Sequence, residues 1–188
     1  MRVTKEKVVE HRHTILETAS RMFRERGFGE VGVAEIMQAS GLTHGAFYGH
    51  FRSKADLAGE ACRAACAQGR ESWRAQPDLS ALIDYYLSPA HRDNPAKGCA
   101  ISALSGEIAR QPAQMQRDYA EGLSNLLAMI EERLEVDDPV AGRAQAIAIM
   151  SSMVGALTLA RGIAAGEPEL SAELLRSLRT QLNERFNI

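Results

Sequence analysis

The chain has 188 residues, of which 45% are hydrophobic and 5% are aromatic, and its formal net charge is −2. This length accommodates one sizeable core or a small domain joined to a larger one, and the weak net charge excludes a uniformly basic nucleic-acid binder. The charge is unevenly distributed, because residues 1–54 carry a net charge of +3 and residues 55–188 a net charge of −5. Any contact with phosphate is therefore expected at the N-terminal end.

Four helices are predicted in the first part of the chain. Apolar residues at three- and four-residue steps predict a helix over residues 6–26, with Arg24 and Arg26 near its C-terminal dipole and Gly27 ending it. Two short helices follow over residues 33–39 and 43–50, and Gly41 lies between them, where a sharp turn requires positive φ. A fourth helix is predicted from residue 54 to about residue 74.

The second short helix has two chemically different faces. The apolar face carries Leu42, Ala46, Phe47 and Phe51, and the polar face carries Thr43, His44, Tyr48 and His50. A helix-turn-helix motif needs this division, because one face docks on its own domain while the other enters the major groove.

The following helix begins with a capping signal. Ser53 and Asp56 have the spacing at which a hydroxyl and a carboxylate satisfy free backbone N–H groups. Lys54 then lies at a helix start, where the backbone dipole already attracts phosphate.

Residues 41–48 (GLTHGAFY) and 50–54 (HFRSK) resemble the recognition helix and the start of the fourth helix in the TetR/AcrR family of transcriptional regulators. The resemblance implies that Tyr48, His50 and Lys54 contact mainly phosphates. Gly32 stands where the family usually has Thr or Ser, which removes a helix cap, and Gly49 stands where a larger polar side chain is common, which removes a base contact. The implied DNA-facing set is Thr43, His44, Gly45, Tyr48, Gly49, His50 and Lys54.

Prolines divide the remainder into further predicted helices near residues 78–88, 97–110, 112–135, 140–165 and 168–186. No alternating strand pattern is present, so we predict an all-α fold of about nine helices. We expect an N-terminal helix-turn-helix domain over residues 1–53, with the motif at about 32–51, and an effector-binding and dimerisation domain over residues 54–188.

The last two predicted helices differ from the others in their surface pattern. Small residues are frequent from 144 to 165, and leucines follow at four-residue steps from Leu170 to Leu182. Both faces either close the core of one subunit or, as the resemblance implies, form a four-helix interface in a homodimer. We favour the homodimer.

No enzymatic motif is present, and we expect neither catalysis nor a cofactor or metal. Cys62, Cys66 and Cys99 are too few for a disulfide framework and match no zinc finger, so reduced thiols are expected. With no membrane-spanning apolar run and no signal-peptide pattern, a cytoplasmic location is expected.

A regulator of this kind responds to a signal, and the sequence leaves two kinds of signal open. Seven residues are candidates to line a pocket for a small-molecule effector, although each is also ordinary core material: Trp73, Tyr85, Cys99, Met115, Tyr119, Met150 and Met153. Alternatively, Cys99 follows Lys97 at a predicted helix start, where the dipole and the lysine lower a thiol pKa and favour redox or electrophile sensing.

The sequence therefore predicts a homodimeric DNA-binding regulator, a repressor released from a palindromic operator by a small molecule. Ordinary half-site geometry places the two recognition helices about 34–36 Å apart. Its rival is a ligand-binding or interaction module whose helix-turn-helix has lost affinity for DNA.

Overall fold

The computed structural model describes residues 4–186, and within that range the chain forms helices and no strand, which confirms the all-α prediction. The outermost residues of the two predicted domains, 1–3 and 187–188, lie outside the described part. In chain order the elements are α1 (Lys5–Glu30), α2 (Val33–Ala39), the 3₁₀ helix η1 (His44–Gly49), α3 (Lys54–Arg74), α4 (Leu79–Tyr86), α5 (Pro89–Asp93), the 3₁₀ helix η2 (Pro95–Lys97), α6 (Ala100–Ile108), α7 (Ala113–Glu131), α8 (Pro139–Ile163) and α9 (Pro168–Phe186).

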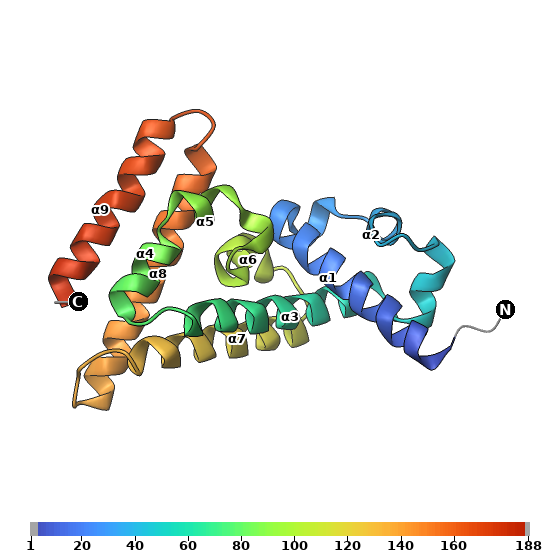
Figure 1. Ribbon diagram of the computed structural model, residues 1–188, viewed down its shortest axis with the longest axis horizontal. Coiled ribbons are helices and arrows are strands. Elements are labelled where there is room, and N and C mark those ends of the chain that lie inside the picture. Colours follow the sequence, from blue (N-terminus) through green and yellow to red (C-terminus); the bar gives the residue numbers. More distant parts are fainter. Residues whose placement is uncertain (1–3, 187–188) are drawn as a thin grey trace.

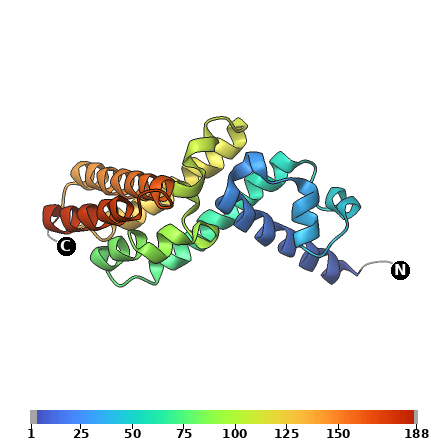
Figure 2. The ribbon, with the colours of Figure 1, turned by 90° about the horizontal axis from the view of Figure 1, so that it is seen from above.

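The molecule is elongated, with α1, α2 and η1 at one end and the α8–α9 pair at the other (Figures 1 and 2). Helix α3 leaves the N-terminal end and lies beside α7 in the body (Figure 1). Because α3 also packs against α1, one continuous helix connects the two ends of the molecule.

Helix α1 extends beyond its predicted end through a kink at Gly27. This residue has φ 84° and ψ 171°, a conformation that is almost restricted to glycine, and one further helical turn follows it. The prediction that Gly27 ends the regular helix is therefore right about the backbone break and wrong about the end of the element.

The segment between α4 and α6 contains two short helices that the sequence pattern did not predict. The Ser88 hydroxyl accepts a hydrogen bond from the backbone N–H of His91 at 3.1 Å, and Pro89 occupies the first turn of α5. Pro95 likewise begins η2. Helices of three to five residues are too short to produce a hydrophobic period, so only their caps and prolines indicated them.

Hydrophobic residues form a continuous core from the helix-turn-helix end to the body. Phe23, Phe47, Trp73 and Tyr86 are among the largest side chains in it, each with at most 1% of its surface exposed. Burial of a side chain of this size contributes about 1.5–3 kcal/mol. The core thus fixes the position of the N-terminal helices relative to α3.

Helix α8 is long and apolar enough, by length and composition, to cross a membrane. A single helix of this kind is weak evidence, because the core helix of a soluble protein passes the same test, and polar residues interrupt α8, so the prediction of no continuous run of about 18 apolar residues is not overturned. In this fold α8 packs against α7 and α9, yet only 33% of its most apolar window is buried. Much of the apolar surface of α8 is therefore exposed in the single chain.

Candidate nucleic-acid interface

The turn between α2 and η1 has the geometry that the sequence predicted. Gly41 adopts φ 70°, and its neighbour Leu42 donates its backbone N–H to the carbonyl of Met37 at 2.9 Å. Gly32, at the N-terminus of α2, provides no side-chain cap, as expected for glycine. The two short elements are thus joined by a tight turn that needs a residue tolerant of positive φ.

The predicted second helix is a 3₁₀ helix, η1, and it begins one residue later than expected. Thr43 precedes it without a side-chain cap, and Gly45 and Gly49 lie within its six residues. Glycine weakens a regular helix through its backbone entropy, which accounts for the short and tighter element.

The apolar face of η1 docks as predicted. Phe47 and Phe51 are 1% and 2% exposed, and their rings lie 5.8 Å apart between centroids. Leu42 and Ala46 pack against the same core. With this face buried, the opposite face has to point outward.

The polar face of η1 is open to solvent. Tyr48 is 70% exposed, and its ring lies edge-on to that of His44 at 6.2 Å. Thr43, Gly45 and Gly49 are also exposed, and a side chain at Gly45 or Gly49 would meet no atom within 4 Å. An exposed aromatic ring beside hydroxyl and imidazole groups suits contacts with phosphate and base edges.

His50 differs from the other predicted DNA-facing residues because one of its ring nitrogens is buried and unpaired. The ring lies edge-on to His11 of α1, with centroids 6.3 Å apart, and its Nδ1 is buried without a hydrogen-bond partner. Burial and then the neighbouring His11 and Arg12 lower the pKa of His50, which keeps the imidazole neutral near pH 7.

Helix α3 begins with the predicted cap. The Ser53 hydroxyl accepts the backbone N–H of Asp56 at 3.1 Å, while Oδ2 of Asp56 accepts the backbone N–H of Arg52 at 3.0 Å. Lys54 is the first residue of the helix and is half-buried. Its backbone therefore lies at the positive end of a 21-residue helix, and its side chain lines a shallow hollow with Phe28, Gly29 and Glu107.

A long-range ion pair that the sequence did not indicate holds α1 against α3. A guanidinium nitrogen of Arg12 donates to Oε1 of Glu60 at 2.7 Å, and the guanidinium carbon lies 4.9 Å from the centre of the Phe51 ring. The two partners are 48 residues apart in sequence, so no helical spacing could reveal the pair.

Further polar contacts on α1 join the N-terminal helices to the body. The Glu107 carboxylate of α6 accepts the backbone N–H groups of Phe28 at 3.0 Å and Gly29 at 3.2 Å, directly after the kink. Arg24 donates to the carbonyl of Gly98 at 3.0 Å. Arg24 was predicted to lie near the C-terminal dipole of the first helix, but α1 continues to Glu30, and the Arg24 side chain turns into the junction, where only 6% of the residue is exposed.

The residues predicted to line an effector pocket lie mostly in the packed core. Trp73, Cys99, Met115, Met150 and Met153 are at most 6% exposed. Tyr119 is half-buried and donates its hydroxyl to the carbonyl of Ile101 at 2.8 Å. Tyr85 lines a groove between α1 and α3.

The predicted low pKa of Cys99 is wrong. Cys99 does stand at the N-cap of α6, but its thiol is buried, and burial raises the pKa of Cys99. Lys97 is exposed, on the outer side of η2, so its charge does not offset this desolvation. A buried thiol of raised pKa is a poor nucleophile, which disfavours electrophile sensing at Cys99.

The leucine row of the last helix is only partly a free surface. Leu182 is buried and Leu174 and Leu178 are half-buried, whereas Leu170 is 47% exposed. On α8, Met150 and Leu157 belong to the core, while Ile147 and Leu159 are 46% and 60% exposed. The predicted interface is therefore reduced to the apolar side chains that remain exposed on these two helices, here called the outer stripe: Ile147, Leu159 and Leu170.

Comparison with known proteins agrees with this geometry. Residues 15–61 match the family described as bacterial regulatory proteins, tetR family. The HTH-type transcriptional regulator AcrR of Shigella flexneri is 42% identical over 59 residues, which are 31% of this chain and 27% of that protein. The probable acrEF/envCD operon repressor of Escherichia coli (strain K12) is 29% identical over 113 residues, 59% of this chain and 46% of the relative.

The likeness in sequence covers less than half of either relative, and the likeness in fold covers nearly the whole chain. A TetR transcriptional regulator from Chloroflexus aurantiacus J-10-FL superposes with a TM-score of 0.76 over 94% of each chain at 24% identity. Residues 15–61 thus match the tetR family of bacterial regulatory proteins, and the fold of the whole chain is similar to that of the TetR-family regulators on which it superposes.

Proposed function

We propose that this protein is a homodimeric transcriptional repressor that binds a palindromic operator through η1 and the start of α3. The observation that carries the proposal is the two-sided packing of η1. Phe47 and Phe51 are buried, whereas Thr43, His44 and Tyr48 are exposed, as a DNA-reading element requires. No catalytic role is part of the proposal, and a cytoplasmic location accompanies it.

The proposed residues divide into two groups by chemistry. Tyr48 and Lys54 supply a hydroxyl and an ammonium group that reach phosphates whatever the base sequence, and Thr43 and His44 stand at the start of η1, where base edges come within reach. Gly45, Gly49 and His50 complete the surface, the two glycines by letting the backbone approach DNA closely.

The outer stripe of α8 and α9 is the proposed dimer interface. Ile147, Leu159 and Leu170 are large apolar side chains left exposed on this pair of helices. Two copies packed on this stripe form a four-helix arrangement and give the twofold symmetry that a palindrome requires. The proposed domain boundary between residues 53 and 54 separates this interface from the helix-turn-helix domain.

Release by a small molecule is the remaining part of the proposal. The long helix α3 contacts both the N-terminal helices and α7, so a ligand that favours one arrangement of the body shifts the population of DNA-competent dimers. In the form described by this structure, the seven predicted pocket residues pack mainly as core.

The test is selection of bound duplexes from random double-stranded oligonucleotides, followed by binding measurements at two salt concentrations. Tyr48→Phe and Lys54→Ala are expected to weaken binding to every duplex and to flatten the salt dependence by about one counterion per lost phosphate contact. Thr43→Ala and His44→Ala are expected to change base preference, with each lost contact costing about 1–3 kcal/mol at one position.

Ser124→Ala, an exposed substitution on α7, is the matched control and is expected to leave both readouts unchanged. Failure to enrich any duplex over the input pool contradicts the proposal and supports a module without DNA affinity. Equal losses on all duplexes for Thr43 and His44 variants contradict their assignment as base readers.

A further inference from the structure

A groove of about 740 Å³ lies at the junction between the helix-turn-helix end and the body. Its lining is contributed by α1, by α3, by Tyr85 of α4 and by η2. The groove contacts elements from both parts of the molecule, so any occupant touches the N-terminal helices and the body together.

A buried guanidinium without an acidic partner lies at the inner end of this groove. Arg24 donates to the carbonyl of Ser20 at 3.2 Å, to the carbonyl of Gly98 at 3.0 Å and to Oε1 of Gln68 at 3.0 Å. All three acceptors are neutral, and Arg24 forms no ion pair within residues 4–186. Burial lowers the pKa of Arg24, although a guanidinium keeps its charge at neutral pH. An uncompensated buried charge is costly, and an anion would offset that cost.

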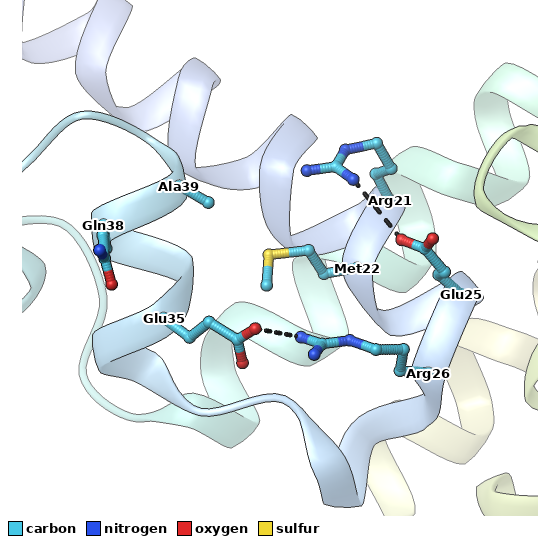
Figure 3. Close-up of a pocket in the computed structure, with 7 residues that line it drawn as sticks. All are labelled: Arg21, Met22, Glu25, Arg26, Glu35, Gln38 and Ala39. Atoms are coloured by element: carbon cyan, nitrogen blue, oxygen red, sulfur yellow. Dashed lines mark hydrogen bonds and ion pairs between the residues drawn. The ribbon is translucent and has the colours of Figure 1, made fainter.

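The hollow on the opposite side of α1 provides a contrast. It lies between α1 and α2, and its charged side chains are already paired (Figure 3). Arg26 donates to Oε1 of Glu35 at 2.6 Å, and Arg21 lies 3.5 Å from Oε2 of Glu25. This hollow therefore has no unmatched charge to attract an ion.

Other groups in the junction groove add to its positive character. Lys97 lines it, directly before the Gly98 carbonyl that Arg24 binds, and has no ion-pair partner among the described residues. Glu17 is the groove's acidic residue and already lies 3.2 Å from Nε2 of His13. The side-chain amide of Gln68 accepts from Arg24 through its oxygen, which leaves its NH₂ group to donate.

The remainder of the lining is suited to an apolar body. Leu16 and Ala64 contribute aliphatic surface from α1 and α3. Tyr85 contributes an aromatic ring held parallel to the His91 ring, with an interplanar angle of 13° and centroids 5.8 Å apart. A ring held by stacking presents a preorganised flat surface.

We propose that this groove binds a small organic carboxylate, with the carboxylate at Arg24, Gln68 and Lys97 and an apolar body against Leu16, Ala64 and Tyr85. The carboxylate supplies the counter-charge that Arg24 lacks, through charge-assisted hydrogen bonds. The apolar body distinguishes this ligand from a simple inorganic anion.

Binding is tested with benzoate as the probe, by thermal unfolding and calorimetric titration at constant ionic strength. The wild-type protein is expected to show a saturable rise in Tm with benzoate, as ligand binding to the native state requires. Benzamide, which has the same ring but no charge, and acetate, which has the charge but no ring, are expected to produce little change. Equal effects of benzoate, benzamide and chloride overturn the proposal.

Gln68→Glu gives the sharpest variant, because it places a carboxylate beside Arg24 with almost no change of shape. We expect this variant to unfold at a higher temperature than the wild type and to bind benzoate at least about tenfold more weakly. Lys97→Ala removes a charge at the rim and is expected to weaken binding about two- to fivefold. Ser124→Glu, which adds the same charge on the exposed side of α7, is the control and should bind benzoate like the wild type.

Retention of benzoate binding by Gln68→Glu contradicts the assignment of Arg24 as the anion partner. Gln68→Glu and Lys97→Ala both alter exposed side chains, so the two variants are expected to fold. These measurements use the protein without DNA, so they stand whether or not the chain represses transcription. Only the consequence for regulation rests on the proposed function, and it is read separately as a change in duplex affinity when benzoate saturates the groove.

Discussion

Glu107→Ala removes the cap that joins α6 to the kinked end of α1. The backbone N–H of Phe28 is part-buried and would lose its partner, which costs about 1–3 kcal/mol, whereas the exposed N–H of Gly29 can turn to water. We therefore expect a loss of about 2 kcal/mol in the free energy of unfolding. For a chain of this size that corresponds to a fall in Tm of about 4–8 °C.

Gly27→Ala reveals whether the cap and the kink act together. Alanine at φ 84° and ψ 171° costs about 1–3 kcal/mol in backbone strain. A Cβ at Gly27 would also overlap the Glu107 carboxylate and displace it, which removes the cap as well. In the wild type both losses apply, whereas in a Glu107→Ala background only the backbone strain remains.

The assay is urea unfolding of the wild type, both single variants and the double variant, followed by circular dichroism. The double-mutant cycle is expected to give a coupling energy of about 2 kcal/mol between the two positions. Glu121→Ala on the exposed side of α7 is the control and should change stability by less than about 0.5 kcal/mol. Strictly additive effects of the two substitutions would refute the contact between α6 and the kink.

Three further outcomes are expected. Ser53→Ala should destabilise the protein by about 1 kcal/mol in urea unfolding, because the start of α3 loses its cap, and restored stability in Ser53→Asp would identify the cap as the cause. Burial lowers the pKa of His91 from 6.5 to about 4, so that on acidification the unfolded chain binds the extra proton before the folded chain does. The contribution of His91 to the free energy of unfolding should therefore be fully present above about pH 6.5 and be lost as the pH drops towards 4. In His91→Gln this pH dependence should disappear. The double variant Ile147→Glu, Leu159→Glu should shift the mass measured by light scattering from that of a dimer to that of a monomer. Val9→Glu, which charges an exposed apolar residue on α1, should leave the mass unchanged. A dimer that persists in the double variant rules out this stripe as the interface.

The helix-turn-helix could be predicted closely because its signals are local. The limits of α2 and α3 agree with the sequence to within the residue, since a turn glycine at 41 and a capping serine at 53 mark the boundaries. The outward set on η1 follows from the period of its apolar residues, although the two glycines within it produced a 3₁₀ helix rather than an α-helix.

The errors share a physical cause. Arg24 was assigned to the dipole at the end of the first helix, and the thiol at the start of α6 to a reactive site, because charge and helix dipole can be predicted from neighbours in sequence. Burial reversed both assignments, and burial depends on which helices pack together. The leucine row of α9 was divided between core and surface for the same reason.

The sequence by itself determined the helical elements, their caps and the polar surface of the reading element, because those depend on residues within a few positions of one another. Tertiary structure alone decided which polar groups meet: Arg24 and Gly98 are 74 residues apart, and Phe28 and Glu107 are 79 apart. Contacts at such separations leave no periodic trace in the chain, so the junction groove and its unmatched guanidinium could emerge only from the folded molecule.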